Sequence, residues 1–188
     1  QAQIERLGVA VATYSKQIWD RTTPLLSAAM FDGSRIQLVR SPAVEPGRTS
    51  FTLRKPTKVM RNIDDFAASG LFKNVRPMQK TLLPHEVELK QLLEHKKYEE
   101  FMRLAVKSRM NIVVSGATGS GKTTFMKGLV LEIPRTERLI TIEDVRELFV
   151  PHQNAVHLLY SKGGQSAANV TPKSLLESCL RMKPDRIL

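Results

Sequence analysis

The sequence predicts an α/β protein with a mostly parallel sheet, preceded by a small α+β N-terminal domain. From residue 111 onward, short apolar runs typical of buried strands alternate with helical patterns. Before residue 56, polar and apolar residues alternate with the period of a strand that has one buried face. A proline-containing segment separates the two patterns. We therefore expect an N-terminal domain over residues 1–73, a linker over 74–84 and a second domain over 85–188.

In the N-terminal domain, the first twenty residues carry apolar side chains at helical spacing, which predicts an amphipathic helix. Strands are expected over residues 35–40 and 49–54, because both segments alternate and a proline- and glycine-containing loop separates them. The residues expected on the buried face are Ile36, Leu38, Phe51 and Leu53. Arg35, Gln37 and Arg54 fall on the opposite faces of their strands.

The second domain is expected to begin with two helices between residues 85 and 109. A rhythm of strand, turn, helix and strand follows. The expected elements are a buried strand at 112–114, a helix at 122–133, strands at 139–142 and 156–160, and the beginning of a strand at 186–188. Thr171 and Pro172 start a further helix, because threonine is a common N-cap and proline is tolerated at the first helical position.

The composition is basic, with 29 Lys and Arg against 18 Asp and Glu and a formal net charge of +11. Such an excess suits a surface that binds nucleic acid, anionic lipid or polyphosphate. A solvated basic face explains the charge equally well, because the cations are scattered and aromatic residues are not interleaved with them. Composition leaves both interpretations open.

A single cysteine, Cys179, excludes an internal disulfide and fits a reducing compartment. Its leucine-rich neighbours predict a buried structural thiol. No apolar run approaches the roughly 18 residues needed to cross a bilayer, and no secretory signal is present. We expect a cytosolic protein, or one that lies on a membrane from the cytosolic side.

A phosphate-binding loop is the strongest motif of the chain. The run Gly116-Ala117-Thr118-Gly119-Ser120-Gly121-Lys122-Thr123, followed by Thr124, matches the pattern G-x-x-x-x-G-K-[ST] in full. Glycines let successive backbone N–H groups surround an anion, and the following helix adds the positive end of its dipole. Lys122 would bring a charge to the β and γ phosphates, and the Thr123 hydroxyl would bind Mg²⁺. The motif predicts a site for a nucleoside triphosphate.

Two acidic residues, Glu143 and Asp144, directly follow the expected strand at 139–142. Because the carboxyl ends of parallel strands open onto one crevice, these carboxylates could face the phosphates. There they would orient the attacking water or hold the Mg²⁺ shell. A polar turn with no catalytic role explains them equally well from the residues alone.

Several segments together resemble the hexameric traffic ATPases of bacterial type IV secretion systems, which are related to type II secretion and pilus-retraction motors. The segments that carry the resemblance are the P-loop region 115–124, the acidic run 139–144, the run 179–188, and three N-terminal segments at 22–26, 32–37 and 50–56. The resemblance therefore covers nearly the whole chain.

This resemblance implies a RecA-like P-loop NTPase fold that uses ATP and Mg²⁺. It implies that Lys122, Glu143 and Asp144 are catalytic residues and that Glu143 activates the attacking water. Thr123 and Glu143 would bind the Mg²⁺ ion. Nucleotide would lie between the two domains, with Arg35 and Arg54 reaching its phosphates from the N-terminal side. It also implies a hexamer that works with other secretion-system components at the cytoplasmic face of the inner membrane.

The chain departs from the family pattern at its end. The acidic residue of the Walker B motif and a later histidine motif are expected beyond Leu188, and Asp185 does not align with that acidic residue. We therefore expect a truncated sheet and half of a catalytic site in these residues.

The leading hypothesis is an ATP-hydrolysing motor subunit that powers assembly of a secretion system or substrate transfer through it. Two alternatives stay open: a DNA-binding or DNA-translocating P-loop motor, suggested by the charge, and a non-catalytic scaffold that uses nucleotide to order an oligomer. A small-molecule kinase is not favoured, because no arginine-bearing lid segment follows the P-loop. Whether DNA or protein is transported does not follow from the residues.

Overall fold

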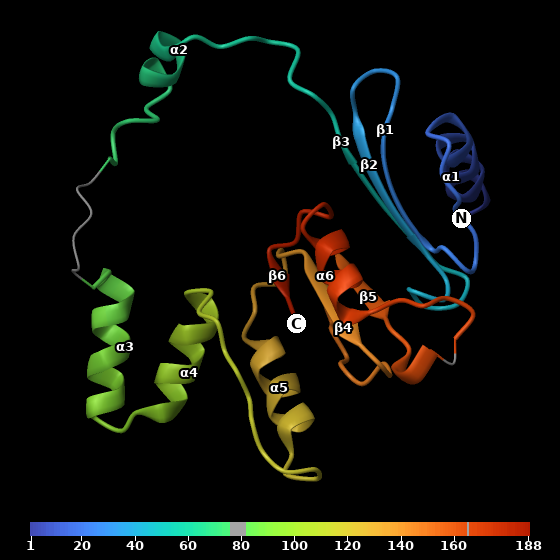
Figure 1. Ribbon diagram of the computed structural model, residues 1–188. Coiled ribbons are helices and arrows are strands. Elements are labelled where there is room, and N and C mark those ends of the chain that lie inside the picture. The colour runs from blue at the N-terminus through green and yellow to red at the C-terminus, as the bar shows by residue number, and fades with distance from the viewer. Residues whose placement is uncertain (76–81, 165) are drawn as a thin grey trace.

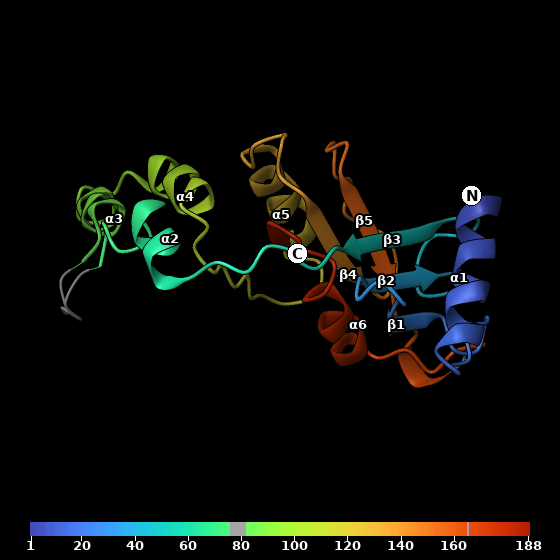
Figure 2. The ribbon, with the colours of Figure 1, turned by 90° about the horizontal axis from the view of Figure 1, so that it is seen from above.

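A computed structural model describes residues 1–75, 82–164 and 166–188. It contains two three-stranded sheets, one antiparallel and one parallel, so the predicted α/β class with a parallel sheet is confirmed. Figures 1 and 2 show the antiparallel sheet between helix α1 and the parallel sheet, with α5 and α4 farther along the same direction. No helix in these ranges is long and apolar enough to cross a membrane.

The N-terminal unit consists of α1 (Ala2–Tyr14), β1 (Leu25–Ala29), β2 (Arg35–Arg40) and β3 (Thr49–Arg54). Its helix and two of its strands are confirmed as predicted, whereas β1 was not predicted. The sheet order is β1-β2-β3, and all its pairs are antiparallel. Its core consists of Val11, Ala12, Trp19, Leu26, Ile36 and Leu38.

The prediction of a single buried face in this sheet is wrong. Gln37 on β2 is only 2% exposed, whereas Phe51 and Leu53 on β3 are 38% and 37% exposed. Strand β2 is central, so α1 covers one of its faces and the parallel sheet with α6 covers the other. Gln37 faces α6, where its Nε2 lies 3.4 Å from the Ser178 hydroxyl oxygen. Strand β3 is an edge strand, which leaves its apolar side chains partly in solvent.

The segment between the two sheets carries α2 (Ile63–Ala68), α3 (Pro84–Glu94) and α4 (Tyr98–Lys107). The pair α3 and α4 confirms the two helices predicted there. Helix α2 was not predicted; it begins at Asn62, whose side chain accepts a hydrogen bond from the Asp65 N–H at 2.8 Å. It lies apart from both sheets in both views. Most of the predicted linker 74–84 lies outside the described residues, and α3 begins at its last residue.

The parallel sheet contains β4 (Leu139–Glu143), β5 (Ala155–Leu159) and β6 (Arg186–Ile187) in the order β5-β4-β6. Helices α5 (Lys122–Leu131) and α6 (Pro172–Cys179) accompany it, and a short 3-10 turn spans Lys162–Gly164. These elements confirm the predicted pattern from residue 122 onward. The Thr171 side chain accepts a hydrogen bond from the Ser174 N–H at 3.1 Å, which confirms the predicted N-cap.

The two sheets share one core. Val39 and Val44 of the N-terminal unit pack in the same buried cluster as Ile140 and Leu158 of the parallel sheet and Leu175 of α6. The Leu158 backbone also forms an isolated bridge with Val44. Cys179 lies in this cluster with no exposed surface, and burial raises the pKa of its thiol to about 11. The expectation of a buried structural thiol is confirmed.

The predicted strand at 112–114 is wrong. These residues adopt no regular structure, and Val113 is 92% exposed. The segment lines a cavity of about 460 Å³ together with Met126, Val130 and Ile187. A strand needs a neighbouring backbone with free N–H and C=O groups, and no strand among the described residues pairs with this segment.

Gly8 supplies the first test of the fold. A Cβ atom at Gly8 would lie 2.0 Å from a ring atom of the buried Trp19. We expect Gly8→Ala to destabilise the full-length protein by about 1–3 kcal/mol through overpacking, against a helix-propensity gain of about 1 kcal/mol. Urea unfolding measures the difference.

Gly128 is the matched control, because it lies within helix α5 and a Cβ there would meet no atom within 4 Å. Gly128→Ala should stabilise the protein by up to about 1 kcal/mol. Equal effects of the two substitutions would contradict the packing of Trp19 on α1.

Candidate functional site

The predicted P-loop forms a tight turn that leads directly into α5. Gly119 and Gly121 have φ angles of +78° and +84°, which L-residues with side chains rarely adopt. Gly121 is the N-cap residue of α5, and a Cβ at Gly116 would lie 2.6 Å from the Ser120 hydroxyl oxygen. The local backbone therefore favours glycine at Gly119 and Gly121, and Gly116 leaves room for the Ser120 side chain. The loop is mostly exposed, and the first N–H groups of the helix have no intrahelical acceptors.

Lys122 folds back over this loop. Its Nζ donates hydrogen bonds to the carbonyl oxygens of Gly116 and Ala117, at 2.8 and 2.6 Å. The ammonium group thus lies over the same turn whose backbone would surround an anion. Motif and geometry agree on one cationic centre, located at the positive end of the α5 dipole.

Thr123 and Glu147 are joined across the site. The Thr123 hydroxyl donates a hydrogen bond to Glu147 Oε2 at 3.0 Å. Sequence reasoning missed Glu147, which lies four residues beyond Glu143 in a segment without regular structure. The only signal in the sequence was its closeness to the acidic pair after β4. Of these three acidic residues, Glu147 is the one hydrogen-bonded to the P-loop.

Glu143 points into the protein. Its side chain is 9% exposed, and its Oε2 accepts hydrogen bonds from the backbone N–H groups of Glu147 and Leu148, both at 2.8 Å. Its Oε1 is buried and has no hydrogen-bond partner among the described residues. Within those residues the structure gives Glu143 no hydrogen bond to the P-loop, so its predicted catalytic and metal-binding roles remain predictions.

Asp144 points away from the protein and pairs with Lys162. Its Oδ1 also accepts a hydrogen bond from the Val145 N–H at 3.0 Å. The Lys162 ammonium holds the pKa of the Asp144 carboxyl below its usual range, and Asp144 raises the pKa of Lys162. The pair is exposed to solvent, so screening by water and salt limits its strength.

His157 lies behind Glu143, on the neighbouring strand β5. Its Nδ1 is 3.0 Å from the Thr141 hydroxyl oxygen and 3.8 Å from Glu143 Oε1. The side chain is buried, and burial together with the positive charge of Arg146 lowers the pKa of the imidazole, against the opposing influence of Glu143. Thr141 and His157, which are paired across β4 and β5, therefore place two polar side chains next to the Glu143 carboxylate.

Arg35 and Arg54 lie directly opposite each other on β2 and β3. They line a hollow of about 960 Å³ together with Arg181 and Lys183 from the segment after α6. In Figure 1, the ends of β2 and β3 that carry them lie on the upper side, and the start of α5 lies at the lower edge. The structure thus brings the two arginines together but does not bring them to the P-loop of the same chain.

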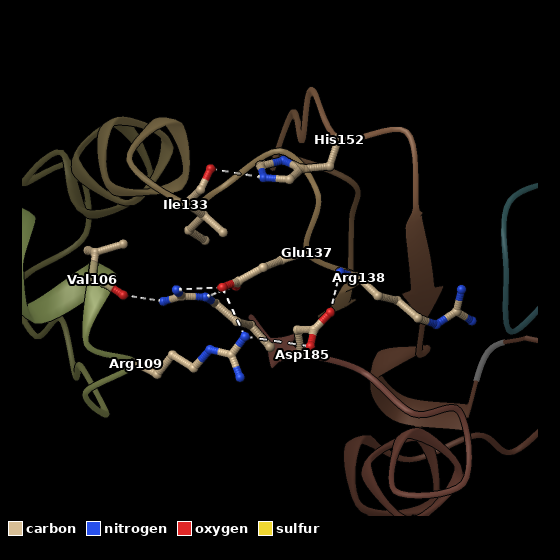
Figure 3. Close-up of polar contacts among 8 residues, drawn as sticks. Val106, Arg109, Ile133, Glu137, Arg138, His152 and Asp185 are labelled. Carbon is tan, nitrogen blue, oxygen red and sulfur yellow. Dashed lines mark hydrogen bonds and ion pairs between the residues drawn. The ribbon is translucent and has the colours of Figure 1, made fainter.

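A second polar cluster lies at the other end of β4 (Figure 3). The Glu137 carboxylate accepts hydrogen bonds from Arg186 Nε at 2.5 Å and from Arg109 Nη2 at 3.1 Å. Arg186 also donates to the Val106 carbonyl of α4. Asp185 accepts the Arg138 N–H at 2.7 Å and pairs with Arg109 at 3.6 Å. These contacts tie α4, the start of β4 and β6 into one unit.

Glu137 gives a testable consequence, because its side chain is only 10% exposed. Removing one partner of such a buried pair costs about 3 kcal/mol, so we expect Glu137→Gln to lower the free energy of unfolding at pH 7 by about that amount. Hydrogen bonds from Arg186 and then Arg109, against the opposing effect of burial, lower the pKa of Glu137.

This pKa shift fixes the sign of the pH dependence. A depressed carboxyl pKa contributes its full stability above the unfolded-state pKa of about 4.3, and loses it as the pH falls through the lower folded-state value. The difference between wild type and Glu137→Gln should therefore shrink below about pH 4. Urea unfolding at several pH values measures it, with Glu88→Gln on the exposed side of α3 as the control. A difference that does not change with pH would contradict this ion pair.

Comparison with known proteins identifies the family. Residues 70–188 match the family model described as "Type II/IV secretion system protein". The chain is 52% identical over 185 residues to the type IV secretion system protein VirB11 of Brucella suis, across 97% of this chain and 51% of that protein. It is 46% identical over 198 residues to VirB11 of Bartonella henselae, across 98% of this chain and 55% of that protein.

A solved structure gives the same result. The crystal structure of the VirB11 ATPase from the Brucella suis type IV secretion system, in complex with sulphate, matches with a TM-score of 0.89 and 51% identity. The match covers 98% of this chain and 55% of that one, so the chain spans about half the length of the relatives it matches. With 52% identity to one relative and a family model over residues 70–188, this chain belongs to the type II/IV secretion system protein family.

Proposed function

We propose that this chain is the nucleotide-binding part of a motor subunit that binds ATP and Mg²⁺ and hydrolyses ATP to power a type IV secretion system. The observation that carries the proposal is the P-loop, with Lys122 over its turn and Thr123 hydrogen-bonded to Glu147. A parallel sheet beside this loop supports a RecA-like fold. The similar Brucella suis protein is described as an ATPase in complex with sulphate, a tetrahedral oxyanion like phosphate.

The residues present suit the phosphates of ATP. Backbone N–H groups at Gly119 to Thr124 and the positive end of α5 would bind the β and γ oxygens. Lys122 would exchange its two carbonyl acceptors for phosphate oxygens, which are stronger acceptors because they are charged. Lys122 would therefore change its hydrogen-bond partners when nucleotide binds.

The same site suits Mg²⁺. The ion prefers oxygen ligands and usually takes one or two from protein, the rest coming from phosphates and water. The Thr123 hydroxyl and the Glu147 carboxylate supply such oxygens at one place. When bound, Mg²⁺ would offset negative charge on the phosphate oxygens. Glu147 is thus a better candidate than Glu143 for the acid that holds the hydroxyl and orients water beside the P-loop.

Asp144, Arg35 and Arg54 keep proposed roles that require rearrangement. Asp144 would have to release Lys162 before its carboxylate could act at the P-loop. The two arginines face a hollow shared with Arg181 and Lys183. They would reach a nucleotide only if the N-terminal sheet moved relative to the P-loop, or if a second copy of the chain supplied the P-loop.

Family membership supports the remaining parts of the proposal, which concern the complete protein. We propose a homo-hexamer at the cytoplasmic side of the inner membrane, working with other components of the secretion system. The relatives of this chain are type IV secretion proteins, which favours this motor over a DNA translocase or a non-catalytic scaffold.

Lys122 gives the direct test of ATP hydrolysis. Lys122→Ala in the full-length protein removes the charge beside the phosphates, and we expect turnover to fall by about 10²–10³-fold. Lys127→Ala is the control, because Lys127 lies exposed on the same helix. Steady-state phosphate release at saturating ATP measures both. Turnover unchanged by Lys122→Ala would refute the proposed function.

The two arginines have a separate test. If Arg35 and Arg54 act on phosphates during hydrolysis, the double change Arg35→Ala with Arg54→Ala should lower turnover by at least about tenfold, roughly 1.4 kcal/mol of lost transition-state stabilisation. Lys58→Ala, an exposed change in the segment after β3, is the control. If the double variant turned over ATP as fast as the control, the proposed role of the two arginines in hydrolysis would be wrong.

A further inference from the structure

We propose that Glu143 is a positioning residue: its buried carboxylate holds the backbone of the turn after β4 so that Glu147 meets Thr123. The inference rests on the proposed ATPase function and deepens it. It replaces the role expected from the sequence, in which Glu143 itself activates water, with an indirect one.

The first step concerns the segment that carries Glu147. Residues 144–150 form neither helix nor strand, so no regular hydrogen-bond ladder fixes the position of this carboxylate. The hydrogen bond at 3.0 Å to Thr123 nevertheless requires a defined backbone. Some other contact must hold the turn.

The Glu143 carboxylate supplies such a contact, in addition to the ion pair between Arg146 and Glu45. One of its oxygens accepts the N–H groups of two consecutive residues, Glu147 and Leu148, at 2.8 Å each. Leu148 is 5% exposed and packs in a core cluster with Val130 of α5, the helix that the P-loop begins. Glu147 is therefore held between a backbone anchor on one side and a packed leucine on the other.

The other oxygen of the Glu143 carboxylate is enclosed by the protein. Oε1 is buried without a hydrogen-bond partner among the described residues, which is costly for a carboxylate. It lies 3.8 Å from His157 Nδ1, which contacts Thr141 at 3.0 Å. The side chain is confined between this pair and the turn. At 9% exposure it presents little surface to a nucleotide at the exposed P-loop.

The variant Glu143→Gln distinguishes a positioning role of Glu143 from a role as catalytic base. In Glu143→Gln, the amide oxygen can accept both N–H groups, and the NH₂ group can donate toward His157. The anchor survives, whereas the ability to accept a proton is lost. Glu143→Ala removes both. A base would not tolerate either change, and a positioning residue would tolerate the first.

The experiment uses the full-length protein and three variants. We expect Glu143→Gln to keep kcat within about threefold of wild type, whereas Glu143→Ala and Glu147→Gln lower it by about 10²-fold, the usual size of a lost acid–base or positioning group. Glu177→Gln, an exposed change on α6, is the control and should match wild type. A Glu143→Gln enzyme as slow as Glu147→Gln would overturn the proposal.

A binding measurement provides a readout that is independent of turnover. ATP binding is measured by calorimetry once in the presence of Mg²⁺ and once in the presence of a chelator. The ratio of the two affinities is the factor by which the metal strengthens ATP binding. Glu143→Gln should keep this factor, and Glu147→Gln should lower it by at least about tenfold, because a charged metal contact is lost. If Glu143→Ala does not fold, the glutamine variant still decides. Wild-type protein that binds no ATP would refute the proposed function, whereas a glutamine variant that loses the Mg²⁺ factor would refute only the positioning role.

Discussion

The pairing of strand β4 between β5 and β6 is the constraint on which the rest of the second unit depends. Leu139, Ile140 and Thr141 have no exposed surface, and the strand is bonded on both edges. Because both faces of this strand are buried and both of its edges are paired, the groups at its two ends are fixed as well. At one end Glu143 begins the turn that leads to Thr123. At the other, Glu137 and Arg138 bind β6 and the end of α4.

The shared core of the two sheets has a consequence for the basic residues. Val39, Val44 and Leu158 are almost fully buried together, and each such side chain contributes about 1.5–3 kcal/mol by leaving water. Moving the N-terminal sheet as a whole would expose this surface. The arginine pair on β2 and β3 is therefore held beside Arg181 and Lys183 by packing. Four cations around one hollow also account for part of the excess positive charge as a local feature.

The sequence predicted the elements whose structure depends on neighbouring residues. It did not predict pairing, burial or contacts that depend on residues far away in the chain. Helix α5, the Thr171 cap and the strands β4 and β5 follow from local pattern, and the structure contains them. Ile112 to Val114 has the composition of a strand, but no strand among the described residues pairs with it. Gln37 is buried because α6 covers it, which alternation along β2 does not reveal. Glu147 was missed because an irregular turn brings it to Thr123, and such a turn leaves no repeating pattern of residues in the sequence.

The strengths of the contacts around the P-loop suit a site that must both persist and change. Two N–H groups bonded to one carboxylate oxygen, as at Glu143, are each worth about 1.5–3 kcal/mol because the acceptor is charged. The Thr123–Glu147 bond lies at an exposed carboxylate, where water competes, and contributes on the order of 1 kcal/mol or less. The weak contact can therefore open for the cation and phosphate that we propose bind here, while the strong pair keeps the turn in place. A site with these strengths reversed would hold Thr123 closed and let the turn drift, so the burial of Glu143 and the exposure of Glu147 follow from one requirement.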